Sequence, residues 1–461
     1  MNDYIIKNIQ IVNEGKSINA DLLIRNQRIE KISQNINVNF KVKEVDGEGL
    51  HLLPGVIDDQ VHFREPGLTH KASIYTESKA AVRGGVTSFM EMPNTMPPAF
   101  THVLLDDKYL TAQKTSLANY SFYLGTSNDN IEEILKANDR KNEVCGVKIF
   151  MGSSTGNLLV NNPLALEKIF SGSELLIATH CEEESVIKAN YEKLKARKGK
   201  LEPADHPVIR DEEACFESSF KAVQYAKKFG SRLHVLHIST AKELQLFTNM
   251  LPLEDKRITA EACVHHLHFS ADDYEDFHYQ IKCNPAIKEA SNKDAIWNAL
   301  LDGRIDVIAT DHAPHLLSEK SLKRDPRGTI CMQSDASYEQ ASAGLPLVQH
   351  SLQLMLHYVH KGKISLEKVV EKMSHNVATC FQVKDRGFIR EGYFADLVLV
   401  NMNKKEEVLP ENILYKCQWS PLEHFTFSST IDKTFVNGHL VYGNGVFDES
   451  YKGERLLFNR K

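Results

Sequence analysis

Residues 54–67 read PGVIDDQVHFREPG. The stretch has the form of a strand whose end delivers metal ligands, a place where a His-x-His pair is expected. His62 fills the second position of such a pair, but a glutamine, Gln60, fills the first. The stretch therefore raises the question of whether the chain has an intact metal site, a weakened one or none.

Short apolar segments alternate with longer helical patterns through most of the chain after this stretch. Helices are expected within residues 74–85, 213–230 and 292–303. Repeated strand–helix units favour a parallel sheet, and about eight of them fit a TIM barrel, so the sequence predicts a (β/α)8 barrel. Strands of this barrel are expected within residues 85–93, 119–127, 144–152, 174–182, 232–240, 258–266, 279–285 and 305–315.

The two ends of the chain are alike in character and differ from the middle. Both contain short segments in which apolar and polar residues alternate, as is typical of half-buried strands. Two Asn-Gly pairs, at 437–438 and 444–445, predict hairpin turns. We expect residues 1–53 and 386–461 to pair as one small β-sandwich domain, beside a barrel domain formed by residues 54–385.

The composition of the 461 residues is that of an ordinary globular protein, with 42% hydrophobic and 25% charged residues. A net charge of −6 argues against a nucleic-acid or anionic-membrane partner. No apolar run reaches the roughly 18 residues that span a membrane, and the N-terminus lacks the apolar core of a secretion signal. Eight cysteines without C-x-x-C spacing are typical of free thiols, so a cytoplasmic location is expected.

Polar side chains follow the apolar run of most candidate strands. In a TIM barrel such positions converge, because chemistry collects at the C-terminal ends of the strands. A lone histidine after a strand is more often structural than functional, but seven polar residues in such positions favour a common site. They are His62, Asn94, Lys148, His180, His237, Asn284 and Asp311.

Three of these histidines, together with Asp311, form a ligand set suited to zinc or a similar divalent ion. Lys148 is the unusual member, because a protonated lysine is costly to bury within an apolar strand. Burial lowers the pKa of an amine, and a neutral amine can react with carbon dioxide to give a carbamate that bridges two metal ions. The alternative is a lysine that reaches solvent from the strand end or forms an ion pair.

The sequence ACVHHLHFS brings His265, His266 and His268 close together. Within a strand, neighbouring side chains point to opposite faces, so the three cannot all converge on one ion. We expect them to be structural or to support the ligands from behind. His234 lies three residues before His237, on the opposite face of the same strand, and is also expected to be structural.

Eight motifs are found in order between residues 54 and 315: PGVIDDQVHFREPG, MEMPNTMP, VKIFMGSSTG, ATHCEEE, LHVLHIST, AEACVHHL, KCNPAIK and IATDHAPH. Together they resemble the motifs of the class I dihydroorotases of the amidohydrolase superfamily. The flanking β segments are similar to the small sandwich domain of those enzymes. The resemblance implies the reversible cyclisation of N-carbamoyl-L-aspartate to L-dihydroorotate in pyrimidine biosynthesis, with two zinc ions per subunit.

The resemblance also implies which residues hold the metal ions. Two residues of the first motif would bind the first ion, and two histidines would bind the second. A carboxylated lysine would bridge the ions. A metal-bound aspartate would take a proton from water as general base and return it to the leaving ring nitrogen as general acid. In that order, the residues are Gln60, His62, His180, His237, Lys148 and Asp311.

The implied substrate carries a free carboxylate, which Arg64 has the fork geometry to bind through two parallel hydrogen bonds. Two stretches are expected to bind or cover the substrate: the small polar residues 152–157 and the long, irregular segment 316–344. The expected substrate-binding residues are Arg64, Asn94, Asn284, His315, Ala343 and Gly344.

Three positions depart from the family pattern. Gln60 replaces a histidine, and a neutral amide oxygen is a weaker zinc ligand than imidazole, so lower occupancy of the first metal site is expected. Lys288 stands where an arginine is usual, and residues 342–349 differ from a glycine-rich segment of the family. The last two departures affect details of substrate contact.

Two other hypotheses stay open. One is a hydantoinase, dihydropyrimidinase or allantoinase; Arg64 argues against it, because substituted hydantoins need an apolar pocket at that place. The other is a catalytically silent homologue that acts as a structural partner of aspartate transcarbamoylase. Five of the six metal positions hold competent residues, which favours an active enzyme. A homodimer, and association with aspartate transcarbamoylase, are the partners that the resemblance implies besides the small-molecule substrate.

Overall fold

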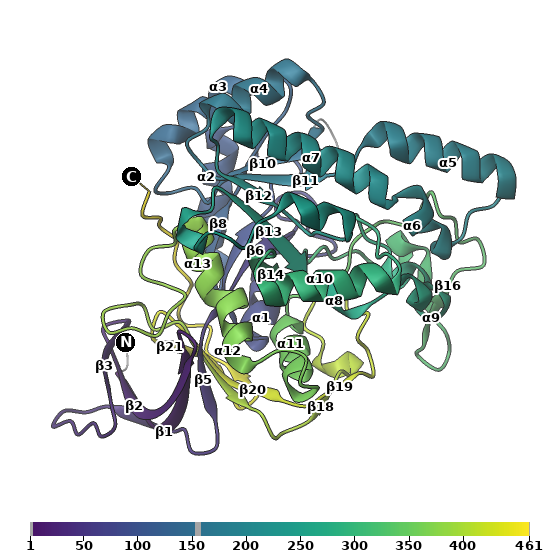
Figure 1. The fold of residues 1–461 in the computed structure, drawn as a ribbon. Helices are drawn as coiled ribbons and strands as arrows, with labels where there is room; N and C mark the ends of the chain where they lie inside the picture. The colour runs from purple at the N-terminus through teal and green to yellow at the C-terminus, as the bar shows by residue number, and fades with distance from the viewer. Residues whose placement is uncertain (1–2, 153–157, 461) are drawn as a thin grey trace.

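The computed structural model describes residues 3–152 and 158–460. Most of the stretch 152–157, which we expect to bind or cover the substrate, lies outside these residues. Helices and parallel strands form the larger part of the molecule, and strands from both chain ends form a β-rich part below it (Figure 1). The α/β class and the β-rich terminal part that the sequence predicts are confirmed.

Nine parallel strand segments form the centre of the larger part. They are β6 (Val56–Val61), β7 (Val86–Glu91), β8 (Asn119–Phe122), β9 (Leu124–Gly125), β10 (Val147–Met151), β11 (Ile177–Cys181), β12 (Leu233–Val235), β13 (Ile258–Cys263) and β14 (Val307–Ala309). β6 to β8 pair in one run, and β9 to β14 pair in another. Tyr123 alone separates β8 from β9, and its backbone N–H donates to Glu91 at 3.0 Å. Val61 forms a parallel bridge with His312, so the first strand and the segment after the last are neighbours.

The helices that cover these strands have well-defined caps. α1 (Ile74–Arg83) begins after Ser73, whose side chain accepts a hydrogen bond from a backbone N–H three residues later. α7 (Glu212–Phe229) ends at Gly230, which adopts the left-handed conformation that glycine allows. The three helices predicted from the sequence are confirmed. Further helices are α2 (His102–Thr115), α3 (Ile131–Lys136), α4 (Pro163–Gly172), α5 (Glu184–Lys198), α6 (His206–Ile209), α8 (Val264–His268), α9 (Tyr274–Phe277), α10 (Ala290–Asp302), α11 (Ser351–His360), α12 (Leu366–Val370) and α13 (Asn376–Phe381).

The prediction of a strand within residues 279–285 is wrong. His278–Ile281 instead forms a 3-10 helix, and the residues after it belong to no strand. Tyr279, Ile281 and Cys283 are apolar and buried, which gives the run the alternation of a strand. Periodicity cannot distinguish such a short run from a buried turn, and β14 already occupies the place beside β13.

The two chain ends form one connected sheet, so the prediction that they pair is confirmed. β5 (His51–Pro54) pairs antiparallel with β17 (Leu397–Asn401) and joins the two ends. Both predicted Asn-Gly turns are present, with positive φ at Asn437 and Asn444 and at the glycine after each. The strand order is β22 (Val446–Phe447), β21 (His439–Gly443), β20 (Thr430–Val436), β17, β5, β1 (Tyr4–Asn13), β2 (Lys16–Arg25) and β3 (Arg28–Ser33), with β4 (Lys43–Asp46) beside β1.

The segment 316–344 contains one short hairpin. β15 (Leu322–Arg324) pairs antiparallel with β16 (Ile330–Met332) inside it. The buried side chain of Lys320 donates to three backbone carbonyl oxygens, two inside the segment and one outside it, and so holds the two ends of the segment together. Those oxygens belong to Lys282, Ser342 and Gly344. Apart from this short hairpin and one 3-10 turn, the segment is irregular as the sequence predicts, and its role as a lid stays a prediction.

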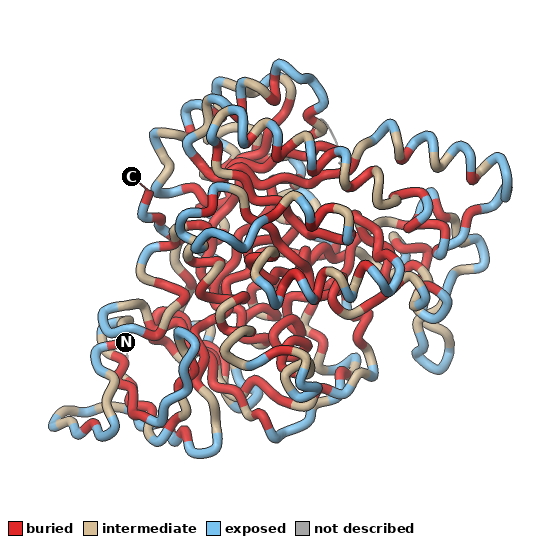
Figure 2. The backbone as a smooth tube through the Cα atoms, in the orientation of Figure 1, coloured by how far each residue is buried: buried red, intermediate tan, exposed pale blue. Residues whose placement is uncertain are grey.

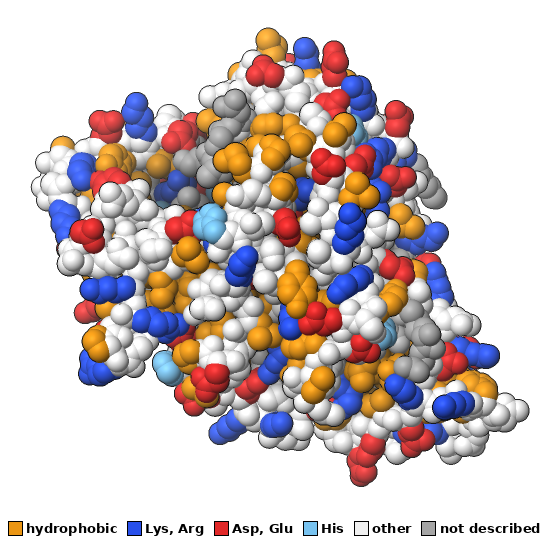
Figure 3. Space-filling view, turned by 180° about the vertical axis from the view of Figure 1, so that it is seen from behind, with side chains coloured by type: hydrophobic (Ala, Val, Ile, Leu, Met, Phe, Trp, Pro, Cys, Tyr) orange, Lys and Arg blue, Asp and Glu red, His pale blue; other side chains and the backbone are white. Residues whose placement is uncertain are grey.

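The parallel strands and the inner faces of the helices around them are buried, and exposed residues lie on outer turns and loops (Figure 2). Apolar side chains such as Ile57, Met90 and Leu236 form one of the buried clusters. On the face shown in Figure 3, basic and acidic side chains are interspersed. Among the residues that the structure describes, no helix has the length and apolar character needed to cross a bilayer.

Candidate active site

A cavity of about 360 Å³ opens where the parallel strands end. Phe150, Ala313 and Ser342 line it without having been predicted. Phe150 lies two residues after Lys148 in β10 and so faces the same side of the strand, a signal that the sequence contained. The twelve predicted site residues all line this cavity: Gln60, His62, Arg64, Asn94, Lys148, His180, His237, Asn284, Asp311, His315, Ala343 and Gly344. Their roles as ligands or substrate contacts stay predictions.

The contacts of His62 leave a bare ring nitrogen facing a carboxylate. His62 Nδ1 lies 2.7 Å from the amide oxygen of Asn94, which can only accept, so Nδ1 carries the proton. Burial lowers the pKa of His62, which keeps the ring neutral and Nε2 unprotonated. Nε2 nevertheless lies 3.0 Å from Asp311 Oδ1. Two lone pairs at this distance repel each other unless a cation lies between them, so this pair fits a metal ion.

His180 and His237 bring two further ring nitrogens together in the cavity. His180 Nδ1 lies 3.0 Å from His237 Nε2, and His237 Nδ1 is buried without a hydrogen-bond partner among the described residues. Burial, and then the nearby charge of His180, hold the pKa of His237 well below its usual value. A neutral imidazole with an unpartnered nitrogen is the form that ligates a divalent metal ion. The donor set of the cavity therefore fits the metal ions that the sequence predicts.

Lys148 lies in β10 and is 1% exposed. Burial lowers the pKa of its amine to about 7, although Asp311 acts in the opposite direction. A large fraction of the amine is therefore unprotonated at neutral pH. This observation supports the expectation of a nucleophilic amine at this position, whereas the alternative of a lysine that reaches solvent does not agree with its burial.

Arg64 brings a buried positive charge to the cavity. Its Nε donates to the Pro314 carbonyl oxygen at 3.3 Å, and one of its terminal nitrogens lies 3.1 Å from His315 Nε2. Burial lowers the pKa of Arg64 to about 10, so it is still protonated at neutral pH. Within the described residues the Arg64 guanidinium forms no ion pair. A buried cation without a carboxylate partner attracts an anionic ligand to the cavity.

His315 is held neutral beside this charge. Its other ring nitrogen, Nδ1, lies 3.2 Å from the ammonium of Lys71. Burial, and then the positive charge of Arg64, hold the pKa of His315 well below its usual value. A neutral imidazole has one lone pair, so it accepts from one of the two cations at a time, and the carboxylate of Glu319 lies 3.6 Å from Nδ1.

Three site residues adopt left-handed backbone conformations, which are uncommon for side chains other than glycine. Arg64 has a φ of 68°, His237 of 40° and Asp311 of 46°. Each turns the chain just after a strand ends. Such conformations cost about 1–3 kcal/mol each and gather at functional sites. They are a second, independent sign that this edge of the strands is the site.

Gly344 allows its segment to approach the cavity closely. A Cβ at Gly344 would lie 2.4 Å from the Ala313 carbonyl oxygen, so a side chain there would collide with the neighbouring backbone. Its φ of 141° also lies outside the range that other residues favour. The backbone at this position can therefore contact a ligand, as the sequence predicts.

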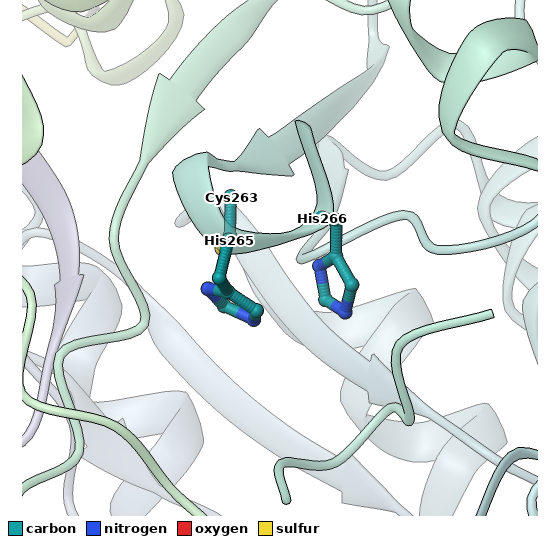
Figure 4. A group of neighbouring side chains, drawn as sticks. All are labelled: Cys263, His265 and His266. Carbon is teal, nitrogen blue, oxygen red and sulfur yellow. The ribbon is translucent and has the colours of Figure 1, made fainter. Parts of the chain in front are cut away.

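The histidine cluster does not lie on a strand. β13 ends at Cys263, and a helical turn, α8, follows. The strand argument about His265 and His266 is therefore wrong: both are buried on one turn, with ring centroids 4.1 Å apart (Figure 4). The prediction that His234 and His237 lie on opposite faces of one strand is also wrong, because β12 ends before His237.

Comparison with known proteins identifies the family. The sequence pattern of the amidohydrolase family matches residues 51–441. The chain belongs to the amidohydrolase family. Among curated members, it is 32% identical to a dihydroorotase of Methanosarcina acetivorans, covering 92% of this chain and 88% of the relative. It is 30% identical to a dihydroorotase of Pyrococcus furiosus, covering 97% and 96%.

Two solved structures of similar fold are named hydantoinases or dihydropyrimidinases, not dihydroorotases. This amidohydrolase superposes on an L-hydantoinase (dihydropyrimidinase) from Arthrobacter aurescens with a TM-score of 0.90, at 26% identity, over 99% of this chain and 100% of that one. A D-hydantoinase (dihydropyrimidinase) from Thermus sp. gives a TM-score of 0.84 at 22% identity, over 98% and 97% of the two chains. The second likeness shows the fold alone.

Gln60 of this amidohydrolase lies at the site but is placed as a hydrogen-bond donor. Its amide nitrogen donates to Asp311 Oδ1 at 3.0 Å, the oxygen that His62 Nε2 also approaches. Its amide oxygen instead lies 3.8 Å from the Cys263 sulfur. The amide would have to turn over to offer its oxygen to a metal ion. In the arrangement described, Gln60 orients the Asp311 carboxylate.

Proposed function

We propose that this amidohydrolase is a dihydroorotase, which interconverts L-dihydroorotate and N-carbamoyl-L-aspartate in pyrimidine biosynthesis. Curated relatives with that name match 87–97% of the chain at 27–32% identity. The observation in the structure that carries the proposal is the buried Arg64 in the cavity. Dihydroorotate has a carboxylate on its ring, and a desolvated guanidinium is its natural partner.

The second candidate is a hydantoinase or dihydropyrimidinase, which the names of the solved structures favour. Hydantoin and dihydrouracil carry no ring carboxylate. Burying the Arg64 charge would then cost free energy that no part of the substrate recovers. Arg64 therefore favours dihydroorotate.

The cofactors we propose are two zinc ions, one bound by Gln60 and His62 together with Asp311 and the other by His180 and His237. Bound ions would lower the pKa of a water molecule and polarise the carbonyl of the ring amide. The neutral Lys148 amine can attack the carbon of carbon dioxide and lose one proton. The product is a carbamate, whose negative charge suits a ligand between two cations.

Side chains of the cavity would transfer the proton and bind the substrate. Gln60 and His62 both contact Asp311 Oδ1, so we place proton transfer at Oδ2. Asp311 takes the proton of the attacking water and returns it to the ring nitrogen as the amide bond breaks. Arg64 binds the ring carboxylate through two parallel hydrogen bonds, assisted by His315. The amide oxygens of Asn94 and Asn284 each contact a histidine ring nitrogen. Their N–H₂ groups are then left to donate hydrogen bonds to the substrate.

Several finer features belong to the same proposal. We propose that the parallel strands close into a (β/α)8 barrel through the neighbours β6 and β14, supported by the Val61–His312 bridge. The terminal sheet would curl into a β-sandwich, with residues 1–53 and 386–461 as one domain and 54–385 as the other. A homodimer, association with aspartate transcarbamoylase and a cytoplasmic location stay predictions, as does the alternative of a silent homologue.

A turnover assay tests the proposal. Purified protein loaded with zinc and bicarbonate is given dihydroorotate, dihydrouracil, hydantoin and allantoin, and kcat/KM is compared. The highest value is expected for dihydroorotate. Faster turnover of hydantoin or dihydrouracil would overturn the assignment, and no turnover of any of them would favour the silent homologue.

A further inference from the structure

We propose that Asp59, His234 and Glu261 bind a further divalent metal ion, of the zinc class, beneath the catalytic cavity. The three side chains come from β6, β12 and β13 and are fully buried. None of them lines the cavity, so they form a separate site. One imidazole and two carboxylates are donors that zinc accepts in proteins.

The distances between the donor atoms fit a shared ion. His234 Nε2 lies 3.2 Å from Asp59 Oδ2 and 3.6 Å from Glu261 Oε2. Two ligand atoms that each lie 2.0–2.2 Å from a tetrahedral zinc ion are about 3.4 Å apart. The two observed separations lie on either side of this value.

The tautomer of His234 leaves the nitrogen that faces the carboxylates free. The Thr259 hydroxyl donates to the Leu233 carbonyl oxygen, and its oxygen lies 2.7 Å from His234 Nδ1. With the hydroxyl hydrogen directed at the Leu233 oxygen, 3.4 Å away, the hydroxyl oxygen accepts from Nδ1–H, and Nε2 of the neutral ring carries a lone pair. A polar group that fixes the other ring nitrogen is typical of metal-bound histidines.

The carboxylate oxygens at this place lack hydrogen-bond donors. Both oxygens of Asp59, Oε2 of Glu261 and Nε2 of His234 are buried without a hydrogen bond in the described residues. His234 Nε2 lies within 3.6 Å of both carboxylates but forms no hydrogen bond with either in the described residues, an arrangement that suits an ion on the Nε2 lone pair. Two carboxylates with three unpartnered oxygens between them are costly to bury, and a divalent cation would neutralise their charge.

The proposed ion would also position a residue of the catalytic cavity. Glu261 has its second oxygen, Oε1, 3.0 Å from the backbone N–H of His237. Fixing Glu261 from below therefore holds the strained backbone of His237 in place. Cys263, His265 and His266 are a weaker candidate, because the Cys263 thiol donates to Glu261 and His266 Nε2 is occupied by the Pro285 carbonyl oxygen.

The rival occupant is a proton. Burial lowers the pKa of His234, but Asp59 and Glu261 outweigh it and raise the value to about 9 when no ion is present. The same three residues would then hold an imidazolium. The experiment must therefore locate the ion itself.

Anomalous diffraction at the zinc edge, from crystals of the unmodified protein grown with zinc, tests the inference. The proposal expects a peak between Asp59, His234 and Glu261, in addition to any peak in the cavity. Metal analysis of His234→Gln should show one zinc equivalent per chain fewer than wild type, and His268→Gln, outside both sites, should show no loss. Anomalous peaks in the cavity without a peak between Asp59, His234 and Glu261 would overturn the proposal. So would a folded His234→Gln variant that binds as many zinc equivalents per chain as wild type. Turnover of dihydroorotate is measured separately, so either proposal can fail alone.

Discussion

Replacing Arg64 by methionine tests substrate recognition, because the change removes the guanidinium group and keeps an unbranched, apolar side chain. Arg64 is 7% exposed and forms no ion pair among the described residues, so a ring carboxylate would be its partner. Removing one member of a buried, hydrogen-bonded charge pair costs about 2–5 kcal/mol. At 1.36 kcal/mol for each factor of ten, kcat/KM for dihydroorotate should fall by about 30- to 5,000-fold.

The assay compares dihydroorotate with dihydrouracil, which has the same ring without the carboxylate. Arg64→Met should lower kcat/KM for dihydroorotate and leave the low value for dihydrouracil unchanged or higher. Arg64→Lys is the matched control, because it keeps the charge and loses the fork, and it should retain part of the activity. An equal loss on both substrates in Arg64→Met would refute the proposed contact, since the residue would then support the fold or the metal site.

Three further predictions follow from other parts of the structure. Gln60→His should tighten binding of the first zinc ion by roughly tenfold or more without abolishing turnover, as read by competition with a chelator; unchanged affinity and turnover would mean that position 60 does not reach the metal. At fixed dissolved carbon dioxide, reactivation of metal-free protein by zinc should slow about tenfold per pH unit below about 7, because Lys148 becomes protonated there; a constant rate down to pH 6 would contradict a reacting amine. Leu399→Ala, in the buried core of the terminal sheet, should lower the free energy of unfolding by about 2–5 kcal/mol and leave kcat unchanged, and a smaller loss would show that the site collapses around the deletion.

Strong periodicity made most of the fold predictable from the sequence. α7 combines a long helical pattern with clear end signals, and the Asn-Gly pair at 437–438 specifies its hairpin through local backbone preference alone. The run 279–285 failed because burial of Tyr279 and Ile281 depends on neighbours that are distant in sequence. A short apolar run carries no information about which sheet edge is free to receive it.

The candidate site was predictable for a different reason. Residues that follow strands are collected by the geometry of parallel strands, so His62 and Asp311, 249 residues apart, meet at 3.0 Å. The orientation of Gln60 was not predictable, because it depends on contacts with Asp311 and Cys263. The buried group around His234 was also missed, since Asp59 and Glu261 approach it from other strands.

The most direct test of the central claim is the ratio of kcat/KM for dihydroorotate to that for hydantoin, measured on the zinc- and bicarbonate-loaded protein. A buried cation in the cavity predicts a ratio well above one, with the preference lost in Arg64→Met. A ratio below one in the wild-type protein would contradict the assignment and make the carboxylate contact of Arg64 untenable.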